Sequence, residues 1–289
     1  ESSEWTLNAM KKYFTSVEAI DIRGIEVHCG SGSLEVMSDG KPISAYDCIY
    51  AKGSFRYAQS LRSLTNALFK KAYMPIRPAT FTLGHDKMLT HLALQLYKIP
   101  MPNTYLASSP EAAKKILKKI NYPIIIKLPS GTGGKGVMYA ESYATASSLL
   151  DTLTTLRQPF LIQEYIETSG EDVRVIVCGD KVIASMKRKA ILGEKRSNIH
   201  AGAQGENYLI DASTKKICVD AAKSIGAEIC AIDLLESLKG PMVIEINLSP
   251  GLQGITEATG VDVADAIAKY LFEKTSSLKE AGTKKETEE

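Results

Sequence analysis

Two short apolar segments that each carry a carboxylate, the second also an amide two residues further on, constrain this chain most. They are Ala231–Leu235 and Val243–Asn247, and a short turn with glycine and proline separates them. Successive side chains of a β-strand point to opposite faces, so Glu245 and Asn247 share one face and isoleucines occupy the other. Asp233 lies on the preceding strand. We expect a hairpin that presents two carboxylates and one amide on a single face of a sheet.

This acidic face predicts a metal site. Ionised carboxylates among apolar residues cost free energy unless they are paired or bound to a metal. Two carboxylates and an amide oxygen form a hard ligand set, which suits Mg²⁺ held together with substrate phosphates. We therefore expect Asp233, Glu245 and Asn247 to ligate a metal ion. A solvated outer sheet face would show the same alternation, so this alternative stays open at the level of the residues.

A glycine-rich loop, Ser130–Gly136, follows an apolar strand that carries Lys127. It matches the dinucleotide fingerprint G-x-G-x-x-G, but that motif needs a helix directly after it, and Val137–Ala140 has the pattern of a strand. The Walker P-loop fails as well, because glycine follows the lysine. We expect a flexible hairpin tip whose N–H groups bind phosphate, although a plain glycine-rich turn has the same composition. Lys127 either extends to solvent or directs its ammonium group at that phosphate.

Composition excludes several classes of protein. The 289 residues are 44% hydrophobic and 24% charged, which is typical of a globular chain. The formal net charge of +2 does not indicate a surface that binds nucleic acid or an anionic membrane. No apolar run approaches about 20 residues, so we expect no membrane span. The five cysteines lack the spacing of a zinc or redox pair, so we expect free thiols and a cytoplasmic location.

The first 79 residues have the pattern of a small α/β unit, and such units usually begin with a strand, so we expect one before Glu1. The charge-dense, aperiodic stretch Lys274–Glu289 is expected to be a disordered tail. The strands that we expect in the first unit are Val17–Ile22, Ile25–Cys29, Leu34–Met37 and Cys48–Ala51, followed by a helix over 57–72.

Several stretches in order resemble the ATP-grasp superfamily, and within it the RimK-like α-L-glutamate ligases. The resemblance runs from about residue 80 to 273. The matching stretches are Gly84–Lys87, Ile126-Lys127, Ser130–Val137, Gln163–Ile166, Glu171–Arg174, Arg188–Ala190, Arg196–His200 and Glu245–Gly254.

The resemblance implies a mixed α/β fold of the ATP-grasp type. An N-terminal α/β domain over 1–79 would precede a two-lobed ATP-grasp domain over 80–273. The lid subdomain would cover about 104–162 and include the glycine-rich lid loop, and 274–289 would be the tail.

The resemblance also implies roles for the matching residues. Arg188 would stabilise charge on the reacting carboxyl group and is the implied catalytic residue. Asp233, Glu245 and Asn247 would ligate two Mg²⁺ ions, for which Mn²⁺ can substitute. The residues that would bind ATP are Lys87, Lys127, Gly133, Gly134, Gly136, Gln163, Glu164, Tyr165, Ile166, Asp172, Arg196, Ser197 and Asn198. Within that set the lysines would contact phosphates, Glu164 and Tyr165 would present backbone groups to adenine, and Asp172 would hold the ribose.

The activity that the resemblance implies is an ATP-dependent ligation through an acyl-phosphate. The amino acid would be L-glutamate, the acceptor a carboxylate-ended protein, peptide or cofactor, and the enzyme a homo-oligomer without nucleic-acid or membrane partners. Three alternatives stay open: another amino acid joined to a carrier protein, a nucleotide-binding module without catalysis, and a dinucleotide oxidoreductase. The chain departs from the family at His200–Ala203, where an arginine is common on the acceptor side.

Overall fold

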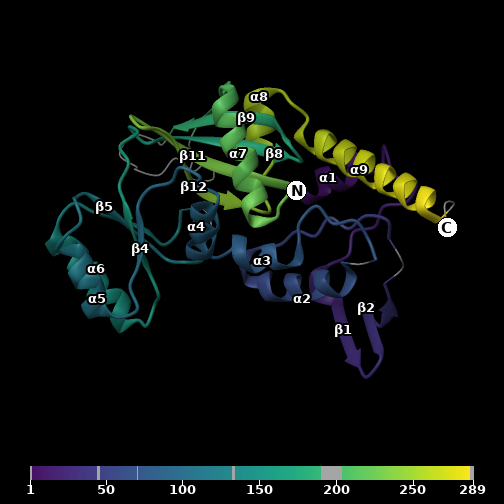
Figure 1. Cartoon of the computed structure of the whole chain (residues 1–289), viewed down its shortest axis with the longest axis horizontal. Coiled ribbons are helices and arrows are strands. Elements are labelled where there is room, and N and C mark those ends of the chain that lie inside the picture. Colours follow the sequence, from purple (N-terminus) through teal and green to yellow (C-terminus); the bar gives the residue numbers. More distant parts are fainter. Residues whose placement is uncertain (1, 44–45, 70, 132–133, 190–203, 287–289) are drawn as a thin grey trace.

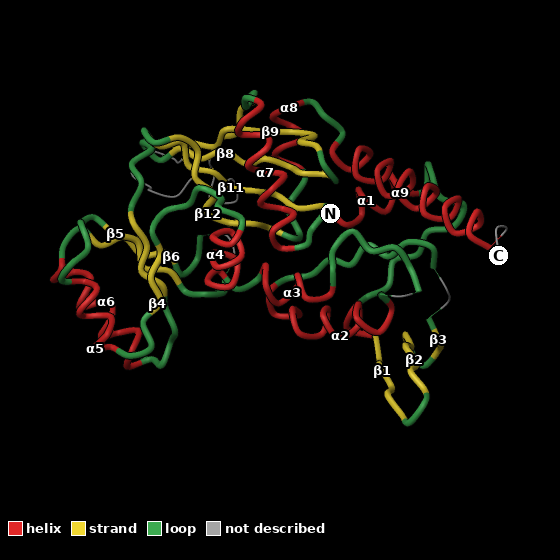
Figure 2. Tube along the Cα trace, in the orientation of Figure 1, coloured by secondary structure: helices red, strands yellow, loops and turns green. Residues whose placement is uncertain are grey.

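The computed structural model describes residues 2–43, 46–69, 71–131, 134–189 and 204–286. Three sheets organise them (Figure 1), with strand orders β1-β2-β3, β4-β7-β5-β6 and β10-β9-β8-β11-β12. Every strand pairing within these sheets, in the described residues, is antiparallel. Helices cover both faces of the five-stranded sheet and one side of the four-stranded sheet (Figure 2), as expected for a mixed α/β protein.

The elements have the following bounds. The strands are β1 (Ile25–Gly30), β2 (Ser33–Ser38), β3 (Lys41–Pro42), β4 (Thr104–Leu106), β5 (Ile124–Lys127), β6 (Val137–Ala140), β7 (Leu161–Glu164), β8 (Glu171–Cys178), β9 (Lys181–Lys189), β10 (Gln204–Asn207), β11 (Ile229–Ser237) and β12 (Gly240–Asn247). The helices are α1 (Ser2–Met10), α2 (Ala58–Leu68), α3 (Pro78–Gly84), α4 (Lys87–Leu96), α5 (Pro110–Leu117), α6 (Tyr143–Thr155), α7 (Ala212–Ile225), α8 (Gln253–Thr259) and α9 (Val263–Glu286).

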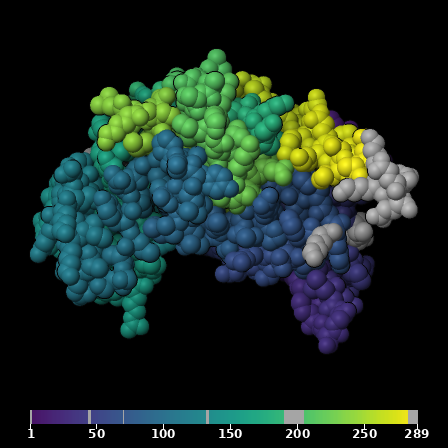
Figure 3. All heavy atoms as spheres, viewed as in Figure 1, coloured from purple at the N-terminus to yellow at the C-terminus, as the bar shows by residue number. Residues whose placement is uncertain are grey.

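The N-terminal region differs in part from the expectation. The hairpin of β1 and β2 is present and projects from the body of the molecule (Figure 3). The expected strand Val17–Ile22 is wrong, because Asp21 accepts a hydrogen bond from the backbone N–H of Arg23 and starts a 3₁₀ turn. The expected strand Cys48–Ala51 is reduced to a single bridge between Cys48 and Tyr73. The small sheet therefore has only short, mostly exposed strands.

The two ends of the chain pack on each other. Helix α1 lies along α9 (Figure 1), and the Tyr13 hydroxyl donates to Asp265 Oδ2 at 2.9 Å. The expectation of a disordered tail from Lys274 is wrong up to Glu286, because α9 continues to that residue. Thr275 is 5% exposed and donates to the carbonyl of Leu271, so the buried face of the helix extends past the expected boundary. No helix in the described residues is long and apolar enough to cross a bilayer.

One face of the five-stranded sheet is divided into an apolar half and a charged half. The opposite face packs against α3, α4 and α7 through residues such as Val175 and Ile232. The divided face packs against α1, α8 and α9 through Ile176, Met186 and Ala231. Further along the same strands this face carries six polar residues, in register with each other across the sheet. These six residues are Asp172, Arg174, Arg188, Asp233, Glu245 and Asn247.

The four-stranded sheet forms a separate small core with α5 and α6 (Figure 1). Its alternating strand β5 buries Ile124 and Ile126 under these helices, which leaves Lys127 at the end of the strand and at the start of the glycine-rich loop. Strand β7 pairs with β5 and carries Gln163 and Glu164. The division of the chain into domains stays a prediction.

Candidate functional site

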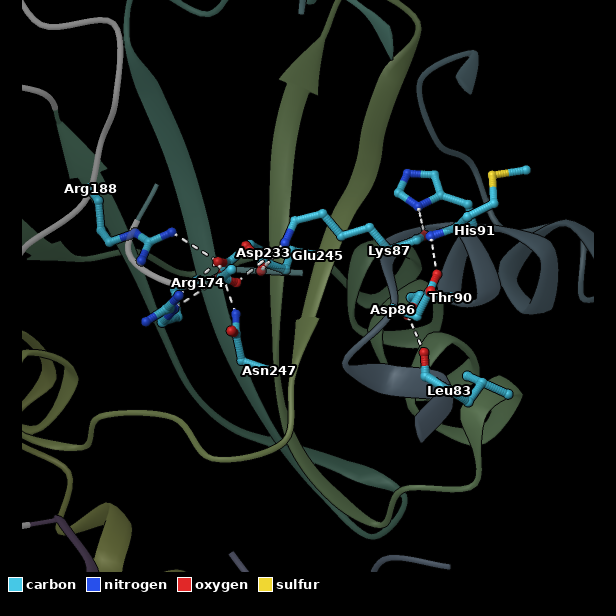
Figure 4. Close-up of polar contacts among 12 residues, drawn as sticks. Leu83, Asp86, Lys87, Thr90, His91, Arg174, Arg188, Asp233, Glu245 and Asn247 are labelled. Carbon is cyan, nitrogen blue, oxygen red and sulfur yellow. Dashed lines mark hydrogen bonds and ion pairs between the residues drawn. The ribbon is translucent and has the colours of Figure 1, made fainter. Parts of the chain in front are cut away.

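A mostly buried network of two arginines and two aspartates occupies the charged half of the sheet face, and Figure 4 labels Arg174, Arg188 and Asp233 of this network. Arg174 binds Asp233 through both ends of its guanidinium group, with Nε–Oδ1 at 2.8 Å and Nη2–Oδ2 at 2.7 Å. Arg188 binds Asp172 in the same two-point manner, with Nε–Oδ1 at 2.7 Å, and its Nη2 lies 3.2 Å from Asp233 Oδ2. Paired guanidinium and carboxylate groups hold each other in a fixed orientation.

Electrostatics keeps the centre of this network ionised. Burial alone would raise the pKa of Asp233, but the guanidinium groups of Arg174 and Arg188 outweigh it and lower that pKa below its ordinary value. Burial likewise opposes the charge on Arg188, yet Asp233 and Asp172 raise its pKa. Burial raises the pKa of Asp172 above its ordinary value, against the opposing attraction of Arg188. Asp233 and Arg188 therefore carry fixed charges at neutral pH.

The three predicted metal ligands lie together (Figure 4), and one of them, Asp233, is also a member of the network. Asp233 and Glu245 are direct partners across β11 and β12, and Asn247 Nδ2 donates to Asp233 Oδ2 at 3.2 Å. Lys87, at the start of α4, places its Nζ 3.5 Å from Glu245 Oε1. Asp233 Oδ2 is crowded by three donors, so Glu245 and the Asn247 carbonyl are the most accessible oxygen ligands.

This donor set fits Mg²⁺ in kind. It offers carboxylate and amide oxygens, which Mg²⁺ prefers, and it leaves most of the coordination shell to water or phosphate. The described residues contain no group of three His, Cys, Asp or Glu side chains placed to hold a metal by themselves. A metal at this face would thus be shared with a substrate.

Lys127 lies partly buried at the edge of this site. In the described part of the chain its ammonium group has no hydrogen-bond or ion-pair partner. Burial lowers the pKa of Lys127 to about 8, against the opposing attraction of Glu245 and Asp233. A partly buried cation without a partner is a site for an anion.

The glycine-rich loop reaches back to Lys87. The Lys87 backbone N–H donates to the Pro129 carbonyl at 3.0 Å, and its Nζ donates to the Gly131 carbonyl at 3.4 Å. Gly134 and Gly136 have φ angles of 71° and 79°, which favour glycine. A Cβ at Gly136 would lie 2.9 Å from Leu128 Cδ1, so close packing also requires glycine there. Gly133 lies outside the described residues.

The expected adenine-binding stretch begins on strand β7 with Gln163. The side chain of this first residue points into the protein. Gln163 is 3% exposed, and its Nε2 lies 3.0 Å from His91 Nε2 and 2.8 Å from Thr104 Oγ1. Glu164 Oε2 accepts from the Asn103 side chain at 2.9 Å. The side chain of Gln163 therefore holds β7 against its neighbours. In our interpretation, a ligand would meet only the backbone groups of Gln163–Ile166. Tyr165 and Ile166, which continue the stretch, are half-buried.

His91 was not a candidate in the sequence, yet it links this strand to Lys87. Its Nδ1 lies 2.6 Å from the Lys87 carbonyl, which only accepts, so Nδ1 carries the proton and Nε2 accepts from Gln163. Burial lowers the pKa of His91 to about 4, so the ring is neutral at pH 7.

We expect His91 to make the protein less stable in acid. Its folded pKa of about 4 lies below the ordinary 6.5, so the unfolded chain binds more protons between these values and stability falls as pH falls from 6.5 to 4. Over this pH range the free energy of unfolding should fall by about 3 kcal/mol. Urea unfolding of wild type and His91→Gln at several pH values should show their difference in stability shrinking on acidification. His28→Gln, at an exposed histidine, should keep a constant difference from wild type, and a constant difference for His91→Gln would contradict the prediction.

Two groups of expected ATP-binding residues stay predictions. Both oxygens of Asp172 bind Arg188 and the residue is 6% exposed, and no observation bears on its expected ribose contact. Arg196, Ser197 and Asn198 lie outside the described residues. Arg174 was missed as a site residue, although its spacing of two from Asp172 places both on one face of β8.

The chain resembles known proteins both in sequence and in fold. The family model described as RimK-like ATP-grasp domain matches residues 84–271. A probable alpha-L-glutamate ligase of Marinomonas sp. (strain MWYL1) is 35% identical over 275 residues, covering 93% of this chain and 90% of that protein. One of Vibrio cholerae serotype O1 (strain ATCC 39541 / Classical Ogawa 395 / O395) is 34% identical over 290 residues, covering 98% and 95%. The ATP-grasp ligase PsnB, solved with a phosphomimetic variant of its minimal precursor, Mg and ADP, has a TM-score of 0.74 at 18% identity and 94% coverage of both chains, which confirms the expected fold. The chain therefore belongs to the RimK-like ATP-grasp family of ligases.

Proposed function

We propose that this chain is an ATP- and Mg²⁺-dependent ligase that joins the amine of L-glutamate to a carboxylate acceptor through an acyl-phosphate. The observation that carries the proposal is Lys127, a partly buried cation without a partner in the described residues, beside the oxygen ligands of Glu245 and Asn247. A triphosphate with its metal ion supplies the negative charge and the shared ligands that this arrangement needs. The relatives named probable alpha-L-glutamate ligase support the choice of amino acid.

Each part of the site has a binding role in this proposal. Lys127 and Lys87 hold ATP phosphates, and the glycine-rich loop covers them with backbone N–H groups. Backbone groups after Glu164 hold adenine. Glu245, Asn247 and Asp233 hold Mg²⁺, which would neutralise phosphate charge when bound. Asp172 orients Arg188.

The proposed reaction has two steps. A carboxylate oxygen of the acceptor attacks the γ-phosphorus, and ADP leaves with the electron pair of the broken P–O bond. The amine nitrogen of the amino acid then attacks the acyl carbon, phosphate leaves, and the nitrogen loses a proton to give the amide. Arg188 is 4% exposed and already binds Asp172 and Asp233, so it acts on the reacting carboxyl group through its charge and its hold on Asp233 and not by direct contact. The more exposed Arg174 adds its charge on the same face. The loop excludes water that would hydrolyse the intermediate.

The location and assembly of the enzyme are part of the proposal. All five cysteines are free thiols in the structure. We infer a cytoplasmic enzyme from these thiols, because disulfides are rare in a reducing compartment. Homo-oligomerisation stays a prediction.

Phosphate release with Mg²⁺ and ATP, measured against amino acids and carboxylate acceptors, tests the proposal. We expect L-glutamate to give a product heavier by one glutamyl unit in mass spectrometry. Glu245→Gln should lower turnover at least about 100-fold, since it removes a charged ligand of the transferring phosphoryl group. Glu257→Gln, at an exposed position on α8, should keep wild-type turnover. Nucleotide binding without any product or phosphate release would favour a binding module, and a product with another amino acid would correct the substrate.

A further inference from the structure

A cavity of about 540 Å³ extends from the proposed ligation site toward the N-terminal region. Its lining residues include Lys87, Glu245 and Asn247 of the proposed site and Gly131 of the glycine-rich loop. They also include Lys52 and Ser249. The cavity therefore connects the place where phosphate would be transferred with groups that no step of the proposed reaction uses.

Hydrogen bonds hold the Lys52 segment against the end of the metal-binding strand. The Gly53 N–H donates to Ser249 Oγ at 3.0 Å, and the Ser249 hydroxyl donates to the Gly53 carbonyl at 3.1 Å. Ser249 follows Asn247 by two residues, so Lys52 keeps a fixed relation to the site. A Cβ at Gly53 would lie 2.7 Å from Leu61 Cδ1, which shows how closely this segment packs on α2.

The charges that line the cavity do not cancel. Glu245 is the only carboxylate among the lining residues that the structure describes, and its Oε1 already lies 3.5 Å from Lys87 Nζ. Both lining histidines are neutral at pH 7, since burial lowers the pKa of His85 and of His91. Lys52 has no hydrogen-bond or ion-pair partner in the described part of the chain, only the face of Tyr50 at 5.5 Å. One positive charge is thus left over in the cavity.

Two further facts indicate that Lys52 faces a ligand. Burial lowers the pKa of Lys52 to about 8, and no carboxylate of the described residues lies within ion-pair distance of its ammonium group. The buried Nε2 atom of His85, which lines the same cavity, also lacks a hydrogen-bond partner among the described residues. Buried polar groups normally find partners, so a cation and an unpartnered ring nitrogen in one cavity point to a ligand with an anionic and a polar group.

We propose that Lys52 binds the carboxylate of the amino-acid substrate that does not react, and thereby selects an acidic amino acid. This inference rests on the proposed function, because it needs the amine of that substrate to reach the acyl-phosphate near Glu245. The same cavity is lined by Lys52 and by Lys87 and Glu245 of the ligation site, so one substrate with an amine and a separate carboxylate can meet both groups. Lys52 is a specificity residue in this arrangement and takes no part in phosphoryl transfer.

Kinetics of Lys52→Met, with Lys52→Arg and the exposed Lys71→Met as matched variants, tests the inference. Loss of one charged hydrogen bond corresponds to about a 10- to 100-fold rise in KM for L-glutamate. We expect kcat and the KM for ATP to stay within about threefold, Lys52→Arg to recover most of the affinity, and Lys71→Met to match wild type. Lys52→Met should also lose the preference for L-glutamate over one of two analogues, L-glutamine or isoglutamine. The analogue for which the preference is lost identifies which carboxylate of L-glutamate Lys52 binds.

The outcomes separate this inference from the proposed function. An unchanged KM for L-glutamate in a folded, active Lys52→Met overturns the inference and leaves the ligase in place. A rise in KM for the acceptor alone also overturns it, because Lys52 would then bind the acceptor carboxylate. If wild type shows no turnover, the proposed function fails, and calorimetry of L-glutamate binding with Mg²⁺ and ADP decides the inference: binding by wild type and not by Lys52→Met supports it, and equal or absent binding refutes it.

Discussion

Replacing Arg188 with methionine is expected to lower the free energy of unfolding by about 3–5 kcal/mol and to abolish turnover. Arg188 is 4% exposed and binds both oxygens of Asp172, whose side chain is 7% exposed. Its removal leaves the Asp172 carboxylate buried without its cation, whereas Asp233 keeps Arg174. Urea denaturation at pH 7 measures the loss in stability, and phosphate release measures the loss in activity.

A double variant separates the structural role of Arg188 from its catalytic role. Arg188→Met with Asp172→Leu removes the buried charge as well as its partner, so most of the lost stability should return. Turnover should stay absent, because no guanidinium group is restored to stabilise the reacting carboxyl group. Arg62→Met, at an exposed arginine that binds Thr82, should change stability by less than about 1 kcal/mol. A stable Arg188→Met protein would contradict the proposed energetics of the pair.

The site residues whose proximity the sequence predicted best lie on two neighbouring strands joined by a short turn, although a β-bulge follows Asp233. The period of a strand fixes which side chains share a face, so the neighbouring positions of Asp233, Glu245 and Asn247 followed from local pattern and a short turn. The return of the chain as strand β6 after the glycine-rich loop was also predictable, because Val137–Ala140 has no helical signal.

The partners of these residues could not be predicted in the same way. Asp172 and Arg188 are 16 positions apart, and Arg174 and Asp233 are 59 apart, so their pairing depends on strand order and register. The residue pattern of a single sequence does not reveal the order of strands in a sheet when several strands have similar composition. His91 has the pattern of an ordinary helix residue, and its role appears only once β7 lies against α4.

Replacing Lys127 with methionine is expected to raise the KM for ATP by about 30- to 300-fold while making the free protein more stable. The ammonium group has no partner in the described residues, and burial lowers its pKa to about 8, so the folded protein bears an uncompensated desolvation cost. Methionine fills a similar volume without that cost, and the midpoint of thermal unfolding should rise by about 1–3 °C. ATP loses a charge-assisted contact to phosphate in a site partly shielded from water, which accounts for the loss of affinity.

The opposite signs of these two effects make the result specific to a ligand-binding cation. Lys119→Met, at an exposed lysine beyond α5 on the same small unit, should change neither the KM for ATP nor the unfolding midpoint. Saturating ATP and Mg²⁺ should raise the midpoint of wild type more than that of Lys127→Met, because only wild type keeps the phosphate contact. A variant with weaker ATP binding and a lower midpoint would show instead that Lys127 supports the fold. Its ammonium would then have a structural partner in the folded protein, and the anion site would have to lie nearer Lys87.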